Sequence, residues 1–210
     1  MKAYEKEIAR KLGEMERDEQ RGRTAPPLLN TNKAKMIKKR GQEAKRQALY
    51  RMSGVDITQI DAIGVETVEV VLSEYGCDLS RFPTEKHFVS HVTLAPYVPK
   101  SGGKPTKKKK RNSASTRVAA ALRMAALSLR HSQTALGAYY RKLAQRIGGD
   151  IAVFATARKL ATLIYRLVRW GQPYVDQGAA AYENRYRQQR ITSLMSKAKE
   201  LSYQLTPATA

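Results

Sequence analysis

One interval of the sequence limits the possible folds of this chain more than any other, because residues 86–149 contain no aspartate or glutamate. The same 64 residues carry 14 lysine and arginine side chains, so their positive charge has no carboxylate nearby in sequence to pair with. Burying an unpaired cation is strongly unfavourable, so most of these side chains must stay at the surface of the fold. We expect that surface to face a polyanion.

The charge of the whole chain points the same way. Its 210 residues include 39 lysines and arginines against 18 acids, a formal net charge of +21. Nucleic acid is the first candidate partner, because neutralising its phosphates releases condensed counterions. A membrane surface is the second, and basic protein partners are disfavoured by repulsion.

The sequence predicts neither a membrane span nor a metal site. The most apolar helical stretch, residues 151–170, is interrupted by four cations, and the charged N-terminus does not resemble a signal peptide. His87 and His91 are four residues apart, but neither His131 nor Cys77 has a spacing that completes a zinc site. We expect no metal ligands in this chain and a cytoplasmic, nucleoid-associated protein.

The first 52 residues are predicted to form a helical arm. Tyr4, Ile8, Leu12 and Met15 recur at helical spacing among charged residues, which indicates an amphipathic, coiled-coil helix that pairs with a partner. Prolines within 24–32 break it, and a basic helix should follow over 33–52. We expect this arm to make a homo-oligomer, a dimer or higher.

Residues 53–206 are predicted to form a compact multi-helix domain, followed by a tail at 207–210. Helices are expected at 65–75 and 84–94, from near Ser113 or Ser115 up to Gly148-Gly149, at 151–170, and at 179–205. Apolar spacing predicts burial of two stripes, listed here by helix: Val118, Leu122, Ala125 and Leu129, then Ile191, Leu194, Ala198 and Leu201. The fold class is therefore mainly α.

Residues 95–112 are predicted to be a basic loop, because three prolines and two glycines exclude regular structure. The loop lies between two packed segments, so its charges should be displayed to nucleic acid. The predicted contacts in and after this loop are Lys100, Gly102, Gly103, Lys104, Lys107, Lys108, Lys109, Lys110, Arg111, Arg117, Arg123 and Arg130. Ser101, taken alone, is an ordinary residue of such a loop.

Two further patterns each have a plain alternative. Residues 60–65 resemble a helix–hairpin–helix turn in which Gly64 would let backbone N–H groups approach a DNA phosphate, or they form an ordinary turn. Tyr174, Tyr182 and Tyr186 lie among arginines, as in sites that stack unpaired bases. We favour helix packing for these tyrosines, with the arginine heads reaching solvent.

The order of several sequence blocks resembles a known family, the DEDD-type insertion-sequence transposases of the IS one-ten group, whose relatives include the Piv-type invertases. The resemblance extends from about residue 47 to residue 205. The blocks that carry it are residues 48–56, 79–88, 101–104, 119–126, 133–141, 155–161, 174–178 and 182–187.

This resemblance implies more than the residues alone. In the family, an RNase H-like domain with four acids binds Mg²⁺, and a coiled-coil arm joins it to a C-terminal transposase domain. The serine that opens the Ser-Gly-Gly loop attacks a DNA phosphodiester, and a structured guide RNA pairs with donor and target DNA in well-studied relatives. By position, Ser101 is that nucleophile.

The sequence departs from the family in three places. Ala62 stands where the family usually has glycine, and His91-Val-Thr replaces a segment that typically bears tryptophan or glycine. The family's acidic domain is expected to precede the arm, whereas this sequence begins within the arm. We therefore expect a truncated or split reading frame or a fragment of a longer protein, with Mg²⁺ only through a separate RNase H-like domain.

Three interpretations remain. The chain is a recombinase subunit that is active only with that domain in trans, or an inactive remnant or regulator that binds nucleic acid and dimerises. The third, a basic RNA-packing protein of ribosomal type, is disfavoured by the regular apolar spacing and by the extent of the family resemblance.

Overall fold

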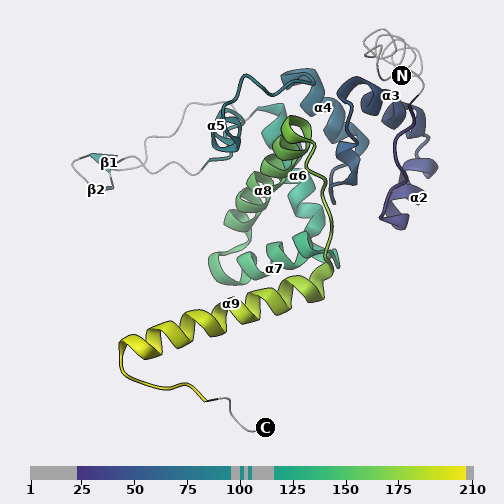
Figure 1. The fold of residues 1–210 in the computed structure, drawn as a ribbon. Helices are drawn as coiled ribbons and strands as arrows, with labels where there is room; N and C mark the ends of the chain where they lie inside the picture. Colours follow the sequence, from purple (N-terminus) through teal and green to yellow (C-terminus); the bar gives the residue numbers. More distant parts are fainter. Residues whose placement is uncertain (1–22, 96–99, 102–103, 106–115, 207–210) are drawn as a thin grey trace.

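The computed structural model describes residues 23–95, 100–101, 104–105 and 116–206, and their regular secondary structure is almost entirely helical (Figure 1). The predicted mainly α fold class is confirmed. The α-helices are α2 (Thr31–Lys39), α3 (Glu43–Ser53), α4 (Val65–Tyr75), α5 (Glu85–His91), α6 (Arg117–Ser128), α7 (Ala135–Ile147), α8 (Gly149–Trp170) and α9 (Gly178–Glu200). Short 3-10 helices are η2 (Ile57–Gln59) and η3 (Leu129–His131), and the strands are β1 (Lys100–Ser101) and β2 (Lys104–Pro105).

The helix α8 is the centre of the hydrophobic core, and it packs against α5, α6 and α7. Leu160, Ile164 and Tyr165 on α8 are completely buried. The Tyr165 hydroxyl donates a hydrogen bond of 2.6 Å to the carbonyl oxygen of Phe82, which satisfies the one polar group of that side chain. The helix predicted over residues 151–170 is therefore confirmed, and one of its faces is buried.

The apolar stripe predicted after the basic loop is also buried, but its helix is shorter than expected. Val118, Leu122, Ala125 and Leu129 all face the core. The prediction of a single helix up to Gly148 was wrong, because the chain turns after η3 and a new helix, α7, begins. The hydroxyl of Thr134 caps α7 by accepting a hydrogen bond from the Gly137 N–H at 3.2 Å, and this capping favours a new helix start.

The basic helix predicted over residues 33–52 is likewise interrupted. Helix α2 ends at Lys39 and α3 begins at Glu43, with Gly41 between them at a φ of 64°, a conformation that glycine adopts without strain. Leu49 and Met52 of α3 belong to the same core as α4 to α8. The division at 52/53 and the tail at 207–210 stay predictions, but α3 shares the core of the helices that follow it.

A buried arginine fixes α3 to the body. The Arg46 guanidinium donates to Asp56 Oδ2 at 2.5 Å and to Thr58 Oγ1 at 3.1 Å, and it also reaches Glu43 Oε1 at 2.9 Å. The side chains of Arg46 and Asp56 are only 5 % and 3 % exposed. Removing one member of such a pair leaves a buried charge without a counterion, so the pair couples α3 to η2.

The last helix, α9, differs from its prediction in burial. Its span agrees closely with the expected helix, but Ile191, Leu194 and Leu201 are 37 %, 52 % and 71 % exposed, and Ala198 is only half-buried. The predicted burial of this stripe is wrong because α9 contacts α7 near its N-terminal half and then extends past the body (Figure 1). No helix among the described residues is long and apolar enough to cross a bilayer.

Candidate nucleic-acid interface

Both ends of the basic loop are anchored at one place on the helical body. The loop follows Leu94, whose side chain is buried, and returns at Thr116, the residue that caps α6. The Thr116 hydroxyl donates to the carbonyl oxygen of Val92 at 3.3 Å and accepts from the Ala119 N–H at 3.0 Å. The intervening segment is therefore a loop that leaves the helical body and returns to it at the same place.

Within this loop, the described residues form a short pair of antiparallel strands, β1 and β2, which Figure 1 shows outside the helical body. Lys100 is paired with Pro105, and Ser101 with Lys104. The expectation that residues 95–112 contain no regular structure was wrong at these four positions. The sequence signal was available, because two glycines between residues that pair are typical of a two-residue hairpin connection.

The backbone register gives Ser101 a defined neighbour in Lys104 on the opposite strand. Several other predicted contacts lie outside the described residues, as does the amphipathic stripe of Tyr4, Ile8, Leu12 and Met15. Those contacts are Gly102, Gly103, Lys107, Lys108, Lys109, Lys110 and Arg111.

Three predicted arginines lie on the first helical segment after the loop. Arg117 is 77 % exposed, with its Nε 4.0 Å from Glu74 Oε1, a distance at which the ion pair is weak. Arg123 lies over the ring of Phe154 at 5.2 Å from its centroid and is half-buried. Arg130 is exposed in η3. Arg117 and Arg130 are thus available to a polyanion, whereas Arg123 also packs.

The turn that contains Gly64 is a structural junction. The Lys33 ammonium donates to the carbonyl oxygens of Thr58 and Ile60, and Asp61 accepts a hydrogen bond of 3.0 Å from the Tyr174 hydroxyl. Burial lowers the pKa of Lys33 to about 8, although the nearby Asp61 opposes this change. The turn therefore joins α2 to the segment after α8.

Gly64 itself is the N-cap of α4 in an extended conformation. A Cβ placed there would lie 3.3 Å from a Glu66 carboxylate oxygen, so a phosphate at this helix start would meet a negative charge. Burial would raise the pKa of Glu66, but hydrogen bonds from its own backbone and from Gln42, with Arg40 nearby, lower the pKa instead. Contact of Gly64 with DNA stays a prediction.

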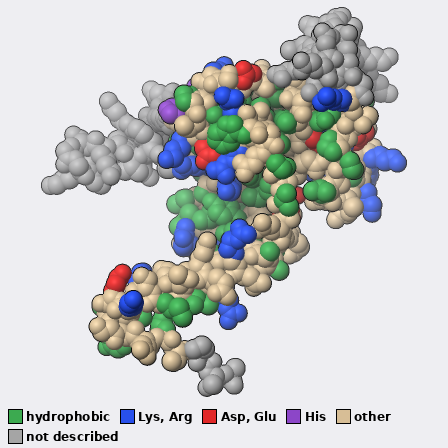
Figure 2. Space-filling model, in the orientation of Figure 1, with side chains coloured by type: hydrophobic (Ala, Val, Ile, Leu, Met, Phe, Trp, Pro, Cys, Tyr) green, Lys and Arg blue, Asp and Glu red, His purple; other side chains and the backbone are tan. Residues whose placement is uncertain are grey.

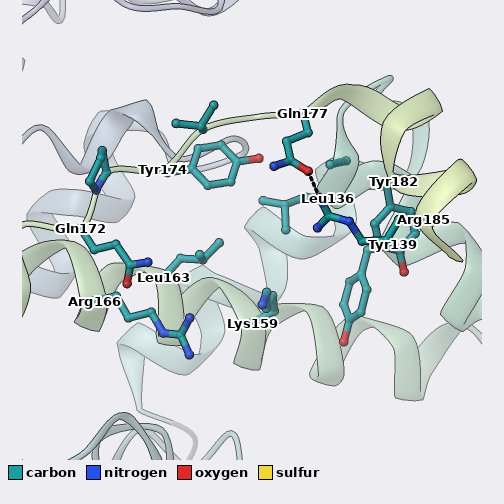
Figure 3. A pocket seen from close by; sticks show the side chains of 13 residues that line it. Leu136, Tyr139, Lys159, Leu163, Arg166, Gln172, Tyr174, Gln177, Tyr182 and Arg185 are labelled. Carbon is teal, nitrogen blue, oxygen red and sulfur yellow. Dashed lines mark hydrogen bonds between the residues drawn. The ribbon is translucent and has the colours of Figure 1, made fainter. Parts of the chain in front are cut away.

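A second basic surface was not predicted from the sequence. It is a hollow of about 550 Å³ between α7, α8, the 172–177 segment and α9 (Figure 3). Figure 3 shows Lys159 and Arg166 reaching it from α8, and Tyr182 and Arg185 from α9. The remaining lining residues are Ala135, Leu136, Tyr139, Leu163, Gln172, Pro173, Tyr174, Val175 and Gln177. Lysine and arginine side chains also extend over the visible face of the body and along α9 (Figure 2).

The tyrosines around this hollow pack, as we expected from the sequence. The Tyr139 and Tyr182 rings meet edge to face at 6.2 Å, and Tyr182 stacks on Tyr186 at 6.4 Å. Burial raises the pKa of both Tyr139 and Tyr182 above the usual tyrosine value, so both rings are neutral near pH 7. The arginines of α9 are exposed, in agreement with heads that reach solvent.

The acids in the described residues are dispersed. Nowhere in residues 23–95 and 116–206 do three or more His, Cys, Asp or Glu side chains gather as a metal site. Glu85, for example, is held by Arg166, whose Nε and Nη2 donate to its two carboxylate oxygens at 2.6 Å and 3.0 Å. The hydrogen bonds from Arg166 lower the pKa of Glu85, despite some burial.

Comparison with known proteins gives one match. Residues 55–141 match a family model described as the Transposase IS116/IS110/IS902 family. The matched segment starts just before η2 and ends within α7, so it includes the hairpin and Ser101. The match supports an IS110-type transposase and, at a general level, a role in DNA transposition and recombination. No curated protein and no solved structure matches the chain.

Proposed function

We propose that this chain is the nucleic-acid-binding C-terminal part of an IS110-type transposase and that Ser101 is its nucleophile. The single observation that carries the proposal is the family match over residues 55–141, which covers the Ser-Gly-Gly-Lys segment. The basic, acid-free interval supports it independently, because strand exchange requires a surface that holds DNA phosphates.

The proposed chemistry is a phosphoryl transfer. The Ser101 oxygen forms a bond to the phosphorus of a DNA phosphodiester and loses its proton, while the bond from phosphorus to one deoxyribose oxygen breaks. That oxygen takes up a proton and leaves as a hydroxyl. The reverse attack by the hydroxyl of a different strand then releases the serine and completes strand exchange.

Lysines beside Ser101 support this step. Lys104 is the pairing partner of Ser101 in the hairpin, and a lysine so close to the nucleophile would hold a neighbouring phosphate as a point charge. Serine is a weak nucleophile at neutral pH, and a carboxylate-held Mg²⁺ can activate such a group. We assign this Mg²⁺ to an RNase H-like domain, as the resemblance to the family implies.

The partners follow from the same proposal. DNA binds to the basic loop and to the exposed arginines of α6 and η3. A structured guide RNA, an oligomer formed through the N-terminal arm and an RNase H-like domain complete the proposed assembly.

The nucleophile is tested by trapping the covalent intermediate. The full chain is incubated with Mg²⁺ and DNA of an insertion-sequence end, with and without the RNase H-like domain of an IS110-type transposase. We expect a denaturant-resistant protein–DNA adduct that maps to Ser101 and forms only when the domain is present. Ser101→Ala should abolish the adduct, whereas the matched variant Ser113→Ala should retain it.

Two results separate the alternatives. An adduct that persists in Ser101→Ala contradicts the assignment of the nucleophile. Salt-sensitive DNA binding with no adduct in any mixture contradicts catalysis and indicates instead a remnant or regulator that binds nucleic acid.

A further inference from the structure

We propose that the hollow between α7, α8 and α9 binds an unpaired nucleotide. The rings of Tyr139 and Tyr182 are nearly perpendicular, so that of Tyr182 would stack on its base, the edge of the base would meet Tyr139, and Lys159 and Arg185 would hold its phosphate (Figure 3). The hollow shares no residue with the hairpin, so this inference goes beyond the proposed function and does not depend on Ser101.

The size of the hollow suits a small ligand. Its volume of about 550 Å³ lies in the range of protein sites for small molecules, roughly 300–1,000 Å³. The lining residues come from three helices and the 172–177 segment, so the walls are built by elements that also pack together. A base inside a duplex stays stacked between its neighbours, so only an unpaired or extruded nucleotide can enter.

The charged side chains that line the hollow are all cationic. Three cations line the hollow, and no carboxylate does. Arg166 is neutralised by its two hydrogen bonds to Glu85, but Lys159 and Arg185 form no ion pair with the described residues. Arg185 donates instead to the amide oxygen of Gln177, which fixes its position without cancelling its charge. Two uncompensated cations beside a hollow select an anionic ligand such as phosphate.

Two half-buried tyrosines, Tyr139 and Tyr182, form the aromatic part of the lining. Their aromatic surface at the hollow, beside cations, has the composition of sites that stack bases without sequence preference.

Stacking is tested with oligonucleotides that keep or lack bases. Fluorescence anisotropy measures binding of the full chain to a labelled 12-nucleotide oligo-dT and to the same strand built of abasic units. Tyr182→Ala should weaken oligo-dT binding about tenfold, because stacking on an aromatic side chain contributes about that much per base. It should leave abasic binding unchanged, and the control Tyr182→Phe should bind oligo-dT as the parent chain does.

The phosphate contact has its own matched variants. Lys159→Ala and Arg185→Ala should each weaken binding of oligo-dT and of the abasic strand. Each should also reduce the slope of log Kobs against log salt by about 0.7, the value for one single-strand phosphate contact. Arg190→Ala removes one exposed cation further along α9, outside the hollow, and should change the slope much less.

A crosslink locates the base without any substitution. Oligo-dT carrying 5-iodouracil is irradiated with the parent chain, and the crosslinked peptide is identified by mass spectrometry. Attachment to Tyr139 or Tyr182 supports the proposal. Attachment confined to other segments overturns it, as does a Tyr182→Ala chain that binds oligo-dT normally or loses abasic and oligo-dT binding equally.

Two further arms identify the source of the nucleotide and separate the two proposals. Oligo-rU in place of oligo-dT shows whether RNA or DNA supplies the unpaired base. Alanine at Lys107, Lys108, Lys109 and Lys110 should weaken duplex binding while oligo-dT binding stays sensitive to Tyr182. If the lysine variant weakens duplex binding but Tyr182→Ala does not weaken oligo-dT binding, the hollow is not a nucleotide site. That result would still support binding of DNA by the basic loop.

Discussion

Helices α8 and α9 are neighbours in sequence and nearly equal in length, with 22 and 23 residues, yet they have opposite surroundings. Eight side chains of α8 are buried, whereas α9 has none. Both carry apolar residues at helical spacing and several cations. The difference shows that spacing defines an apolar face but not whether anything covers it.

The same contrast divides the charged residues. Arg46 and Lys33 lie inside the body, where their heads are held by carboxylates or carbonyl oxygens, while the arginines of α9 are exposed. Charges in the body are therefore held by protein groups, whereas the arginine heads of α9 are exposed to solvent. Four paired substitutions break or sharpen this comparison.

The largest difference is expected for buried and exposed arginines. Arg46→Ala leaves Asp56 buried without its counterion and should cost about 3–5 kcal/mol of unfolding free energy in urea denaturation. Arg190→Ala on α9 should change that free energy by less than about 0.5 kcal/mol. A cost below about 1 kcal/mol for Arg46→Ala would show that water reaches Asp56.

The second pair of substitutions compares a buried leucine with an exposed one. Leu160→Ala opens a cavity in the fully buried face of α8 and should cost about 2–5 kcal/mol. Leu194→Ala, at a side chain that is 52 % exposed, should cost less than about 0.5 kcal/mol by the same measurement. Equal losses would mean that another surface covers α9 in solution.

The third pair compares how a half-buried and an exposed lysine affect the pH dependence of the unfolding free energy. The pKa of Lys33 is about 8 in the folded chain and near its ordinary 10.5 when unfolded, so the folded state releases this proton first. Stability should therefore rise between pH 8 and about 9.5, by about 1–2 kcal/mol, as the cost of the buried charge disappears. Unfolding of Lys33→Met should lack this rise, and Lys197→Met on α9 should keep it. A rise of equal size in Lys33→Met would assign it to other groups.

The smallest effect concerns two residues with positive φ. Ala62 has a φ of 65° in the turn before α4, and Ser202 has a φ of 63° just after α9. Ala62→Gly relieves a left-handed alanine and should raise the unfolding free energy by about 0.5–1 kcal/mol. Ser202→Gly should not change it, because the segment after α9 is exposed. Thermal unfolding of both variants measures the difference. Ala62 is half-buried against the core, so destabilisation by Ala62→Gly would mean that the packing of its methyl group outweighs the backbone strain.

Sequence reasoning predicted the body well because several signals agreed there. The helix at 65–75 was predicted to the residue, and the helix expected from residue 84 is α5, which Thr84 caps by accepting from the His87 N–H. Apolar spacing, caps and breaking glycines are local features, and each is reliable where the core also requires the helix. Gly171, for example, ends α8 at a φ of 62°.

The errors arose where the outcome depends on distant residues. Whether Leu194 is buried depends on what lies beside α9, and no local pattern contains that information. The break before α7 was marked by Ser132 and Thr134, but continuous apolar spacing masked it. The hollow joins Tyr139, Lys159 and Arg185, which are far apart in sequence, so only the packing of α7, α8 and α9 brings them together.

The central claim is that the acid-free interval binds polyanions through the lysines of its loop. Its most direct test is the salt dependence of duplex DNA binding, measured for the parent chain and for a variant with alanine at Lys107, Lys108, Lys109 and Lys110. A matched control removes four exposed cations from α2 and the residue after it, Lys35, Lys38, Lys39 and Arg40. We predict that the loop variant reduces the slope of log Kobs against log salt by about 3–4, close to 0.9 per lost phosphate contact, and that the control changes the slope little. Equal slopes for the parent chain and the loop variant would contradict the claim.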